Sequence, residues 1–190
     1  MINILIIGVG GQGSLLASRI LGDYYAAEGL SVKMSEVHGM AQRGGSVVTY
    51  IRAGVDVFDP LVSPGEADVI IAFEELEALR WHKYLKPGGH LVYSTQRIFP
   101  VPVLTGAATY PDAVEADLAE ADLLAVRVDA LALASQAGNV KCTNVVMLGA
   151  AATLLSYDKE RLFASLARCI KPKLLAMNET ALRLGMDVVK

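Results

Sequence analysis

Cysteine is scarce in this chain: only two of its 190 residues are cysteines, Cys142 and Cys169. Two thiols cannot form a disulfide framework. They are also too few for the thiolate ligands of an iron–sulfur cluster or of a closed zinc site. We therefore interpret both as small buried hydrophobic residues, and we expect no metal site on this chain.

Charged residues are also few, at 19% of the chain, whereas 53% of the residues are apolar. A disordered chain has the opposite balance, so we expect one folded domain over residues 1–190. Apolar runs such as Ile4–Ile7 are far shorter than the ~20 residues that cross a bilayer, which argues against a membrane protein. The net charge of −3 favours no nucleic-acid surface. No secretion signal is recognisable, so we expect a cytoplasmic location.

The hydrophobic pattern alternates between short β-rich runs and longer runs with helical spacing. Strands are predicted over 2–8, 30–37, 46–52, 68–73, 90–95 and 124–128, with a proline-containing edge strand at 98–103. Helices are predicted over 11–28, 74–85, 113–121, 130–137, 143–156, 158–170 and 173–184, the last capped by Gly185. The alternation predicts a Rossmann-like, doubly wound α/β domain with a mostly parallel sheet and a helical C-terminal third.

The clearest motif is the glycine-rich turn at Gly8–Gly13, which matches G-x-G-x-x-G between a predicted strand and a predicted helix. Glycines let the backbone approach an anion, and the start of a helix favours negative charge. Glu36 ends the second predicted strand, where an NAD protein carries its ribose-binding acid. A dinucleotide site is one interpretation, and a plain strand–helix turn is the other. The candidate ligand-binding residues here are Gly10, Gly11, Gln12 and Gly13.

The connection between the second and third predicted strands counts against a dinucleotide. Only residues 38–45 separate the two strands, whereas a parallel crossover needs about a dozen residues or more. We therefore expect the third strand to pair antiparallel. An antiparallel third strand differs from a dinucleotide-binding half, in which the strands that follow the G-x-G-x-x-G turn are parallel.

The same connection gathers polar side chains at the end of a strand, where open α/β sheets bind ligands. Arg43, followed by two glycines, can present a bidentate donor beside exposed N–H groups, which suits a carboxylate or a phosphate. An ion pair between Arg43 and Glu36 is the structural alternative. The cofactor-binding candidates are Arg43, Gly44 and Gly45, the substrate candidates are Glu36, His38 and Gln42, and no catalytic residue is identified.

Two motifs together, GVGGQG at 8–13 and SEVHGMAQRGG at 35–45, resemble the gamma-type domain of the 2-oxoacid:ferredoxin oxidoreductases. The resemblance runs along nearly the whole chain. Leu182 departs from the family, whose members often carry an aromatic residue there. Further agreement comes from Asp59-Pro60-Leu61, Glu66-Ala67-Asp68, Gly138-Asn139 with Asn144, Leu148-Gly149-Ala150, and Asn178-x-x-Ala181-x-x-x-Gly185.

The resemblance implies oxidative decarboxylation of a 2-oxoacid, such as indolepyruvate or another arylpyruvate, to an acyl-CoA with reduction of ferredoxin. Loss of CO₂ leaves an acyl carbanion that needs an electron sink such as thiamine diphosphate. This chain has no G-D-G…N motif for that cofactor, because Gly22-Asp23 falls inside the first predicted helix.

We therefore expect a small subunit that holds no cofactor by itself. Thiamine diphosphate, Mg²⁺ and iron–sulfur clusters are expected on a larger partner, which passes electrons to ferredoxin, with coenzyme A as co-substrate. The alternative is a free-standing NAD(P)- or nucleotide-binding Rossmann-like protein.

Two acids, Glu74 and Glu75, follow the fourth predicted strand. For both, capping of the next helix is favoured over a catalytic role, because carboxylates are stabilised at a helix N-terminus. The high apolar fraction also predicts that a partner covers part of the surface.

Overall fold

The computed structural model describes residues 1–39, 44–121 and 123–189. Its described residues form a six-stranded sheet in the order β2-β3-β1-β4-β5-β6. Strands β1, β4, β5 and β6 are parallel neighbours, and β3 runs antiparallel to both β1 and β2. The strands are β1 Ile2–Val9, β2 Ser31–His38, β3 Ser46–Gly54, β4 Ala67–Ala72, β5 Leu85–Ser94 and β6 Leu124–Val128.

The reversed strand β3 confirms the prediction made from the short connection. Its register places Ser46 opposite Val9 on one side and Thr49 opposite Glu36 on the other. Strand β3 therefore lies between β1 and β2. The mostly parallel, doubly wound α/β fold is confirmed with this one irregularity.

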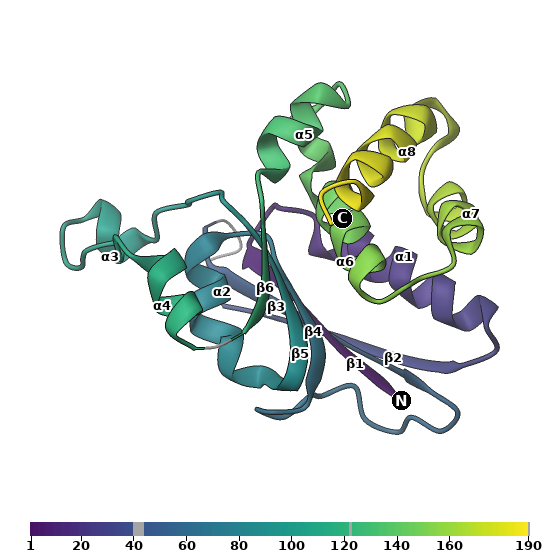
Figure 1. The fold of residues 1–190 in the computed structure, drawn as a ribbon, viewed down its shortest axis with the longest axis horizontal. Helices are drawn as coiled ribbons and strands as arrows, with labels where there is room; N and C mark the ends of the chain where they lie inside the picture. The colour runs from purple at the N-terminus through teal and green to yellow at the C-terminus, as the bar shows by residue number, and fades with distance from the viewer. Residues whose placement is uncertain (40–43, 122, 190) are drawn as a thin grey trace.

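Helices cover both faces of the sheet (Figure 1). On β1, Ile4 and Ile6 face one hydrophobic cluster, and Leu5 and Ile7 face the other, as strand alternation requires. The first face carries α1 Ser14–Ala27, α5 Ala130–Gln136, α6 Thr143–Leu154, α7 Lys159–Cys169 and α8 Pro172–Met186. The second face carries α2 Glu75–Trp81 and α4 Val114–Glu120.

The last three helices confirm the predicted helical C-terminal third, but the predicted cap is wrong. Gly185 lies inside α8, where a Cβ would overlap the carbonyl of Val146 on α6. Gly149 on α6 meets the backbone of α8 in the same way. Both glycines therefore permit a close helix crossing, and neither ends a helix.

Two other predictions need correction. The predicted edge strand at 98–103 is instead the start of a short helix, α3 Val101–Leu104, whose first turn holds Pro102. Proline fits a first helical turn because the N–H group that it lacks would have no intrahelical acceptor there. The helix predicted over 74–85 ends earlier, at Trp81. A 3₁₀ turn, η1 His82–Tyr84, then leads directly into β5.

None of the described helices has the length and apolar character to cross a membrane.

Candidate functional site

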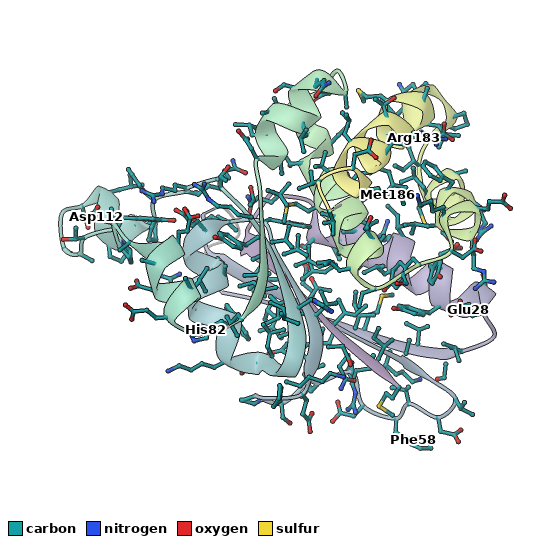
Figure 2. All side chains as sticks on the ribbon, viewed as in Figure 1. Glu28, Phe58, His82, Asp112, Arg183 and Met186 are labelled. Atoms are coloured by element: carbon teal, nitrogen blue, oxygen red, sulfur yellow. The ribbon has the colours of Figure 1, made fainter. Side chains whose placement is uncertain are left out.

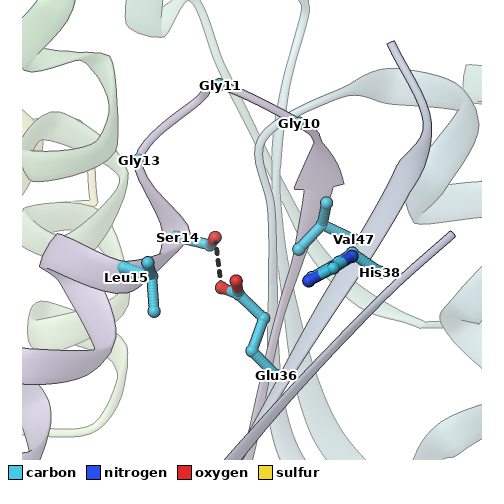
Figure 3. Close-up of a pocket in the computed structure, with 8 residues that line it drawn as sticks. All are labelled: Gly10, Gly11, Gly13, Ser14, Leu15, Glu36, His38 and Val47. Carbon is cyan, nitrogen blue, oxygen red and sulfur yellow. Dashed lines mark hydrogen bonds between the residues drawn. The ribbon is translucent and has the colours of Figure 1, made fainter. Parts of the chain in front are cut away.

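A cavity of about 330 Å³ opens at the carboxyl ends of the strands (Figure 3). It brings together five of the residues predicted from sequence, drawn from the glycine turn and from the end of β2. Gln12 and Gly44–Gly45 line neighbouring cavities. Gln42 and Arg43 lie outside the described residues. The lining is Gly10, Gly11, Gly13, Ser14, Leu15, Glu36, His38 and Val47.

The glycine-rich turn at 8–13 and the segment at 35–45 are hydrogen-bonded to each other. The amide of Gly10 donates to the carbonyl of Gly45 over 2.9 Å, so the turn after β1 is tied to the strand connection. Gly11 and Gly13 have positive φ angles of 101° and 86°. Such angles favour glycine, and they turn the chain from β1 into α1 within four residues, 10–13.

Not all amides of this turn are open to a ligand. Those of Gly10 and Gln12 are bonded to the carbonyls of Gly45 and Val9. Within the described part of the chain, the amides of Gly11, Gly13 and Ser14 have no protein acceptor. These three amides lie at the positive end of α1, so an anion is best placed beside them.

Gln12 braces the turn. Its Oε1 accepts from the amide of Val9 over 2.7 Å, and its Nε2 donates to the carbonyl of Phe73 over 2.8 Å and to Gln96 over 3.1 Å. The side-chain amide thus joins the ends of three strands. With these bonds made, Gln12 positions the backbone rather than presenting a free group to a ligand.

Glu36 lies on β2 and faces the start of α1 (Figure 3). Its Oε2 accepts from Ser14 Oγ over 2.9 Å and from Thr49 Oγ1 over 3.1 Å. In a dinucleotide-binding half, the second strand lies next to the first. Here β3 intervenes, and the carboxylate of Glu36 already occupies the region beside the helix start. This geometry opposes a dinucleotide phosphate at this cavity.

His38 is exposed at the end of β2, and its Nδ1 lies 3.4 Å from the carbonyl of Gly39. The ring lines the cavity across from Ser14 (Figure 3). Its position leaves the imidazole accessible to a ligand in this cavity.

A second cavity, of about 460 Å³, lies on the other side of Gly11–Gly13. It is lined by the turn together with Gln96, Leu131, Val140, Lys141 and Thr143. Lys141 therefore lines the same cavity as Gly11 and Gly13, whose amides have no acceptor within the described residues. Sequence reasoning missed this residue, because nothing in its local pattern connects it to a turn about 130 residues earlier.

Asn144 was also assigned no role from sequence. Its Nδ2 donates to the carbonyl of Gly13 over 3.1 Å, and a Cβ on Gly13 would lie only 2.5 Å from the same nitrogen. The third glycine of the fingerprint therefore makes room for Asn144. This contact fixes the start of α1 against α6.

Three buried acids follow β4. Glu74 accepts from the amide of Glu77 over 2.9 Å, which confirms its predicted role as the cap of α2. Glu75 forms an ion pair with Arg97, and Glu77 forms one with Arg80. Each carboxylate has a partner, so these acids hold structure together and leave no free catalytic group.

The donor set does not fit a metal or a cluster. Within the described residues, no group of three or more His, Cys, Asp or Glu side chains could hold a metal ion. Burial raises the pKa of the Cys142 thiol and is the main cause of the raised pKa of Cys169. A metal-bound cysteine needs the opposite shift, toward thiolate.

Sequence comparison finds full-length relatives. The model of the family described as pyruvate ferredoxin/flavodoxin oxidoreductase matches residues 3–188. Indolepyruvate oxidoreductase subunit IorB of Thermococcus kodakarensis is 42% identical over 99% of this chain and 96% of that protein. The subunit of the same name from Archaeoglobus fulgidus is 39% identical over 98% and 94%.

Solved structures share the fold. The gamma subunit of a keto/oxoacid ferredoxin oxidoreductase from Geobacter sulfurreducens matches with a TM-score of 0.74 and 19% identity, over 99% of this chain and 98% of that one. The 2-oxoglutarate:ferredoxin oxidoreductase of Magnetococcus marinus matches with the same TM-score and 21% identity, over 98% of this chain and 30% of that chain.

Proposed function

Because the chain belongs to the pyruvate ferredoxin/flavodoxin oxidoreductase family, we propose that it is the small subunit of a heteromeric indolepyruvate:ferredoxin oxidoreductase. The carrying observation is its 42% identity, over 99% of its length, to the IorB subunit of Thermococcus kodakarensis. In the proposed reaction, a 2-oxoacid and coenzyme A give an acyl-CoA, CO₂ and a proton. Two electrons reduce two ferredoxin molecules.

The proposed reaction requires cofactors for which this chain supplies no ligands. Decarboxylation needs an electron sink, and transfer to ferredoxin needs one-electron carriers. With two cysteines whose thiol pKa values are raised, the chain offers no cluster ligands. We therefore assign thiamine diphosphate, Mg²⁺ and the iron–sulfur clusters to a larger subunit. A single gamma-type domain over residues 1–190, working in the cytoplasm, is part of the same proposal.

This subunit is proposed to bind the phosphate groups of coenzyme A. Of the two cavities beside Gly11–Gly13, one carries the Glu36 carboxylate and the other carries Lys141. An anion is repelled by the first and attracted by the second. The amides of Gly11 and Gly13, two residues that line the Lys141 cavity, would complete the site near the start of α1.

The remaining sequence candidates keep their proposed roles beside this anion site. Glu36 and His38 line the cavity of about 330 Å³. As substrate contacts they would face the uncharged aryl end of a 2-oxoacid, because the Glu36 carboxylate repels the carboxylate of the substrate. Arg43 and Gln42 lie outside the described residues, and their roles as carboxylate or phosphate clamp and substrate contact stay predictions.

The test compares the isolated chain with the complex. The chain is purified alone and together with the large subunit of its own organism, and indolepyruvate- and coenzyme A-dependent reduction of a viologen dye is followed. We expect turnover only in the complex, and no visible cluster absorbance in the isolated chain. Turnover by the chain alone, or a complex that reduces no dye with any aryl-2-oxoacid, would overturn the proposal.

A further inference from the structure

The segment between β5 and α4, residues 98–110, projects from the sheet as an arm that carries α3 (Figure 1). Its sequence, IFPVPVLTGAATY, has no charged residue, in a chain of which 19% is charged. Val101 is 59% exposed and Leu104 is 69% exposed. The arm therefore presents large apolar side chains to solvent without an ionised group among them.

Both ends of the arm are held by one buried carboxylate. Glu74, which is 1% exposed, accepts from the amide of Ile98 over 3.0 Å and from the hydroxyl of Tyr110 over 2.7 Å. Just before the arm, Arg97 forms an ion pair with the buried Glu75 and lies over the Tyr110 ring. Burial and the neighbouring Glu74 raise the pKa of Tyr110, which keeps its hydroxyl protonated as a donor. The arm is thus built on a fixed base.

The arm also borders the candidate site. Pro100, Val101 and Pro102 line a cavity of about 220 Å³ together with Gly44 and Gly45 of the 35–45 segment. The ion-paired side chains of Glu77 and Arg80 line the same cavity, so charge at this side of the arm is already paired within the chain. A partner that covers the carboxyl ends of the strands therefore meets the arm as well.

We propose that the arm docks this chain onto the large catalytic subunit, inserting Val101 and Leu104 into an uncharged, apolar groove there. This inference rests on the proposed function. An arm without charge matches an apolar surface, because a charged groove would lose its hydration without gaining a partner. A second copy of this chain is disfavoured as the partner of the arm. It would cover the carboxyl ends of the strands, where the catalytic subunit must bind in the proposed function.

Phe58 provides a matched control. It is 90% exposed on the loop between β3 and β4, at the opposite end of the sheet. Figure 2 labels it far from Asp112, which lies just beyond the arm. Asp56 and Asp59 lie within two residues of Phe58, whereas residues 98–110, which carry Val101 and Leu104, include no charged residue.

The experiment compares Val101→Asp/Leu104→Asp with Phe58→Asp, each as the full chain titrated with purified large subunit. We expect the dissociation constant to rise about 30-fold or more for the arm variant, because interface anchors have effects of this size. For Phe58→Asp we expect a change within about twofold, as for other surface changes. Leu104→Met keeps the apolar contact and should bind like the wild type.

The outcomes separate the two proposals. If the wild type binds the large subunit and the arm variant binds equally well, or if Phe58→Asp abolishes binding instead, the docking role is wrong. If the wild type self-associates without the large subunit and the arm variant does not, the arm binds a second copy of this chain. That result also overturns the docking role. A wild-type chain that binds no large subunit contradicts the proposed function itself. At saturating large subunit, an unchanged kcat in the arm variant supports docking, and a reduced kcat with unchanged affinity contradicts it.

Discussion

The two ends of the sheet differ in how far their polar groups are paired within the described residues. At the amino end, Asp68 pairs with Lys86, Glu28 pairs with Arg161, and the hydroxyls of Tyr25 and Tyr157 bond to each other. At the carboxyl end the buried carboxylates after β4 are paired too, but the amides of Gly11, Gly13 and Ser14 have no acceptor. Paired groups contribute to stability, whereas open donors at a helix start are suited to a ligand.

This contrast separates stability from function along the direction of the strands. Ligand sites of open α/β sheets lie at the carboxyl ends of the strands, and the amino ends are free to be closed by packing. Substitutions at the amino end should therefore change unfolding and leave turnover of the assembled complex alone. Substitutions of exposed side chains that line the cavities at the carboxyl end should do the reverse.

The largest expected effect is at the amino end, in Tyr157→Ala. The Tyr157 ring stacks on Tyr24 with centroids 4.6 Å apart and meets Tyr25 edge-on at 5.7 Å. Removing a packed aromatic ring should lower the free energy of unfolding by about 3–5 kcal/mol. Urea denaturation measures this loss. At a temperature where the variant stays folded, KM and kcat of the complex should match the wild type. A raised KM for coenzyme A would show that the amino end of the sheet also affects ligand binding.

A smaller effect is expected at the carboxyl end, in Lys141→Ala. Loss of a charge-assisted hydrogen bond to a phosphate should raise the KM for coenzyme A by roughly tenfold or more. The KM for indolepyruvate and the urea midpoint should not change. Lys141→Arg, which keeps the charge, should retain most of the affinity.

Lys86→Ala is the matched control for Lys141. It removes a lysine at the amino end whose ion pair with Asp68 is partly exposed. Such pairs contribute at most about 1 kcal/mol, so only a small loss of stability is expected. Equal KM values for coenzyme A in the Lys141 and Lys86 variants would show that the second cavity does not bind the anion.

Much of the fold was predictable because it depends on local pattern and chain length. The short connection at 38–45 was enough to predict that β3 runs antiparallel. The prediction that Gly185 caps the last helix was wrong, because a glycine is required there by a contact with Val146, which lies far away in the sequence. The prolines at 100 and 102 suggested an edge strand, although they lie at the start of α3, and the chain just before them is anchored to the distant, buried Glu74.

The site shows the same division. The glycine turn and the 35–45 segment were located from sequence, since their spacing is itself the signal. Lys141 was missed, and Asn144 was noted in the resemblance without a role, because folding brings both to the glycine turn from more than 125 residues away. A local motif can locate the backbone of a candidate site, but the side chains that lie beside it here come from the distant segment 141–144.

The smallest expected effect is a pH dependence at the amino end, tested with Tyr157→Phe. Burial, with Tyr25 nearby, raises the pKa of Tyr157 well above its usual value of 10. The folded state therefore keeps a proton that the unfolded state releases above pH 10, so this contribution to stability is present below pH 10 and is lost as the pH rises further. Between pH 10 and pH 11, the wild type should lose about 1 kcal/mol more than Tyr157→Phe, which has no hydroxyl to titrate there. Urea midpoints at pH 8, 10 and 11 measure the difference. Lysines and the other tyrosines titrate in both proteins, so they cancel in the comparison. Parallel pH profiles would show that burial does not raise the pKa of Tyr157 in the folded state.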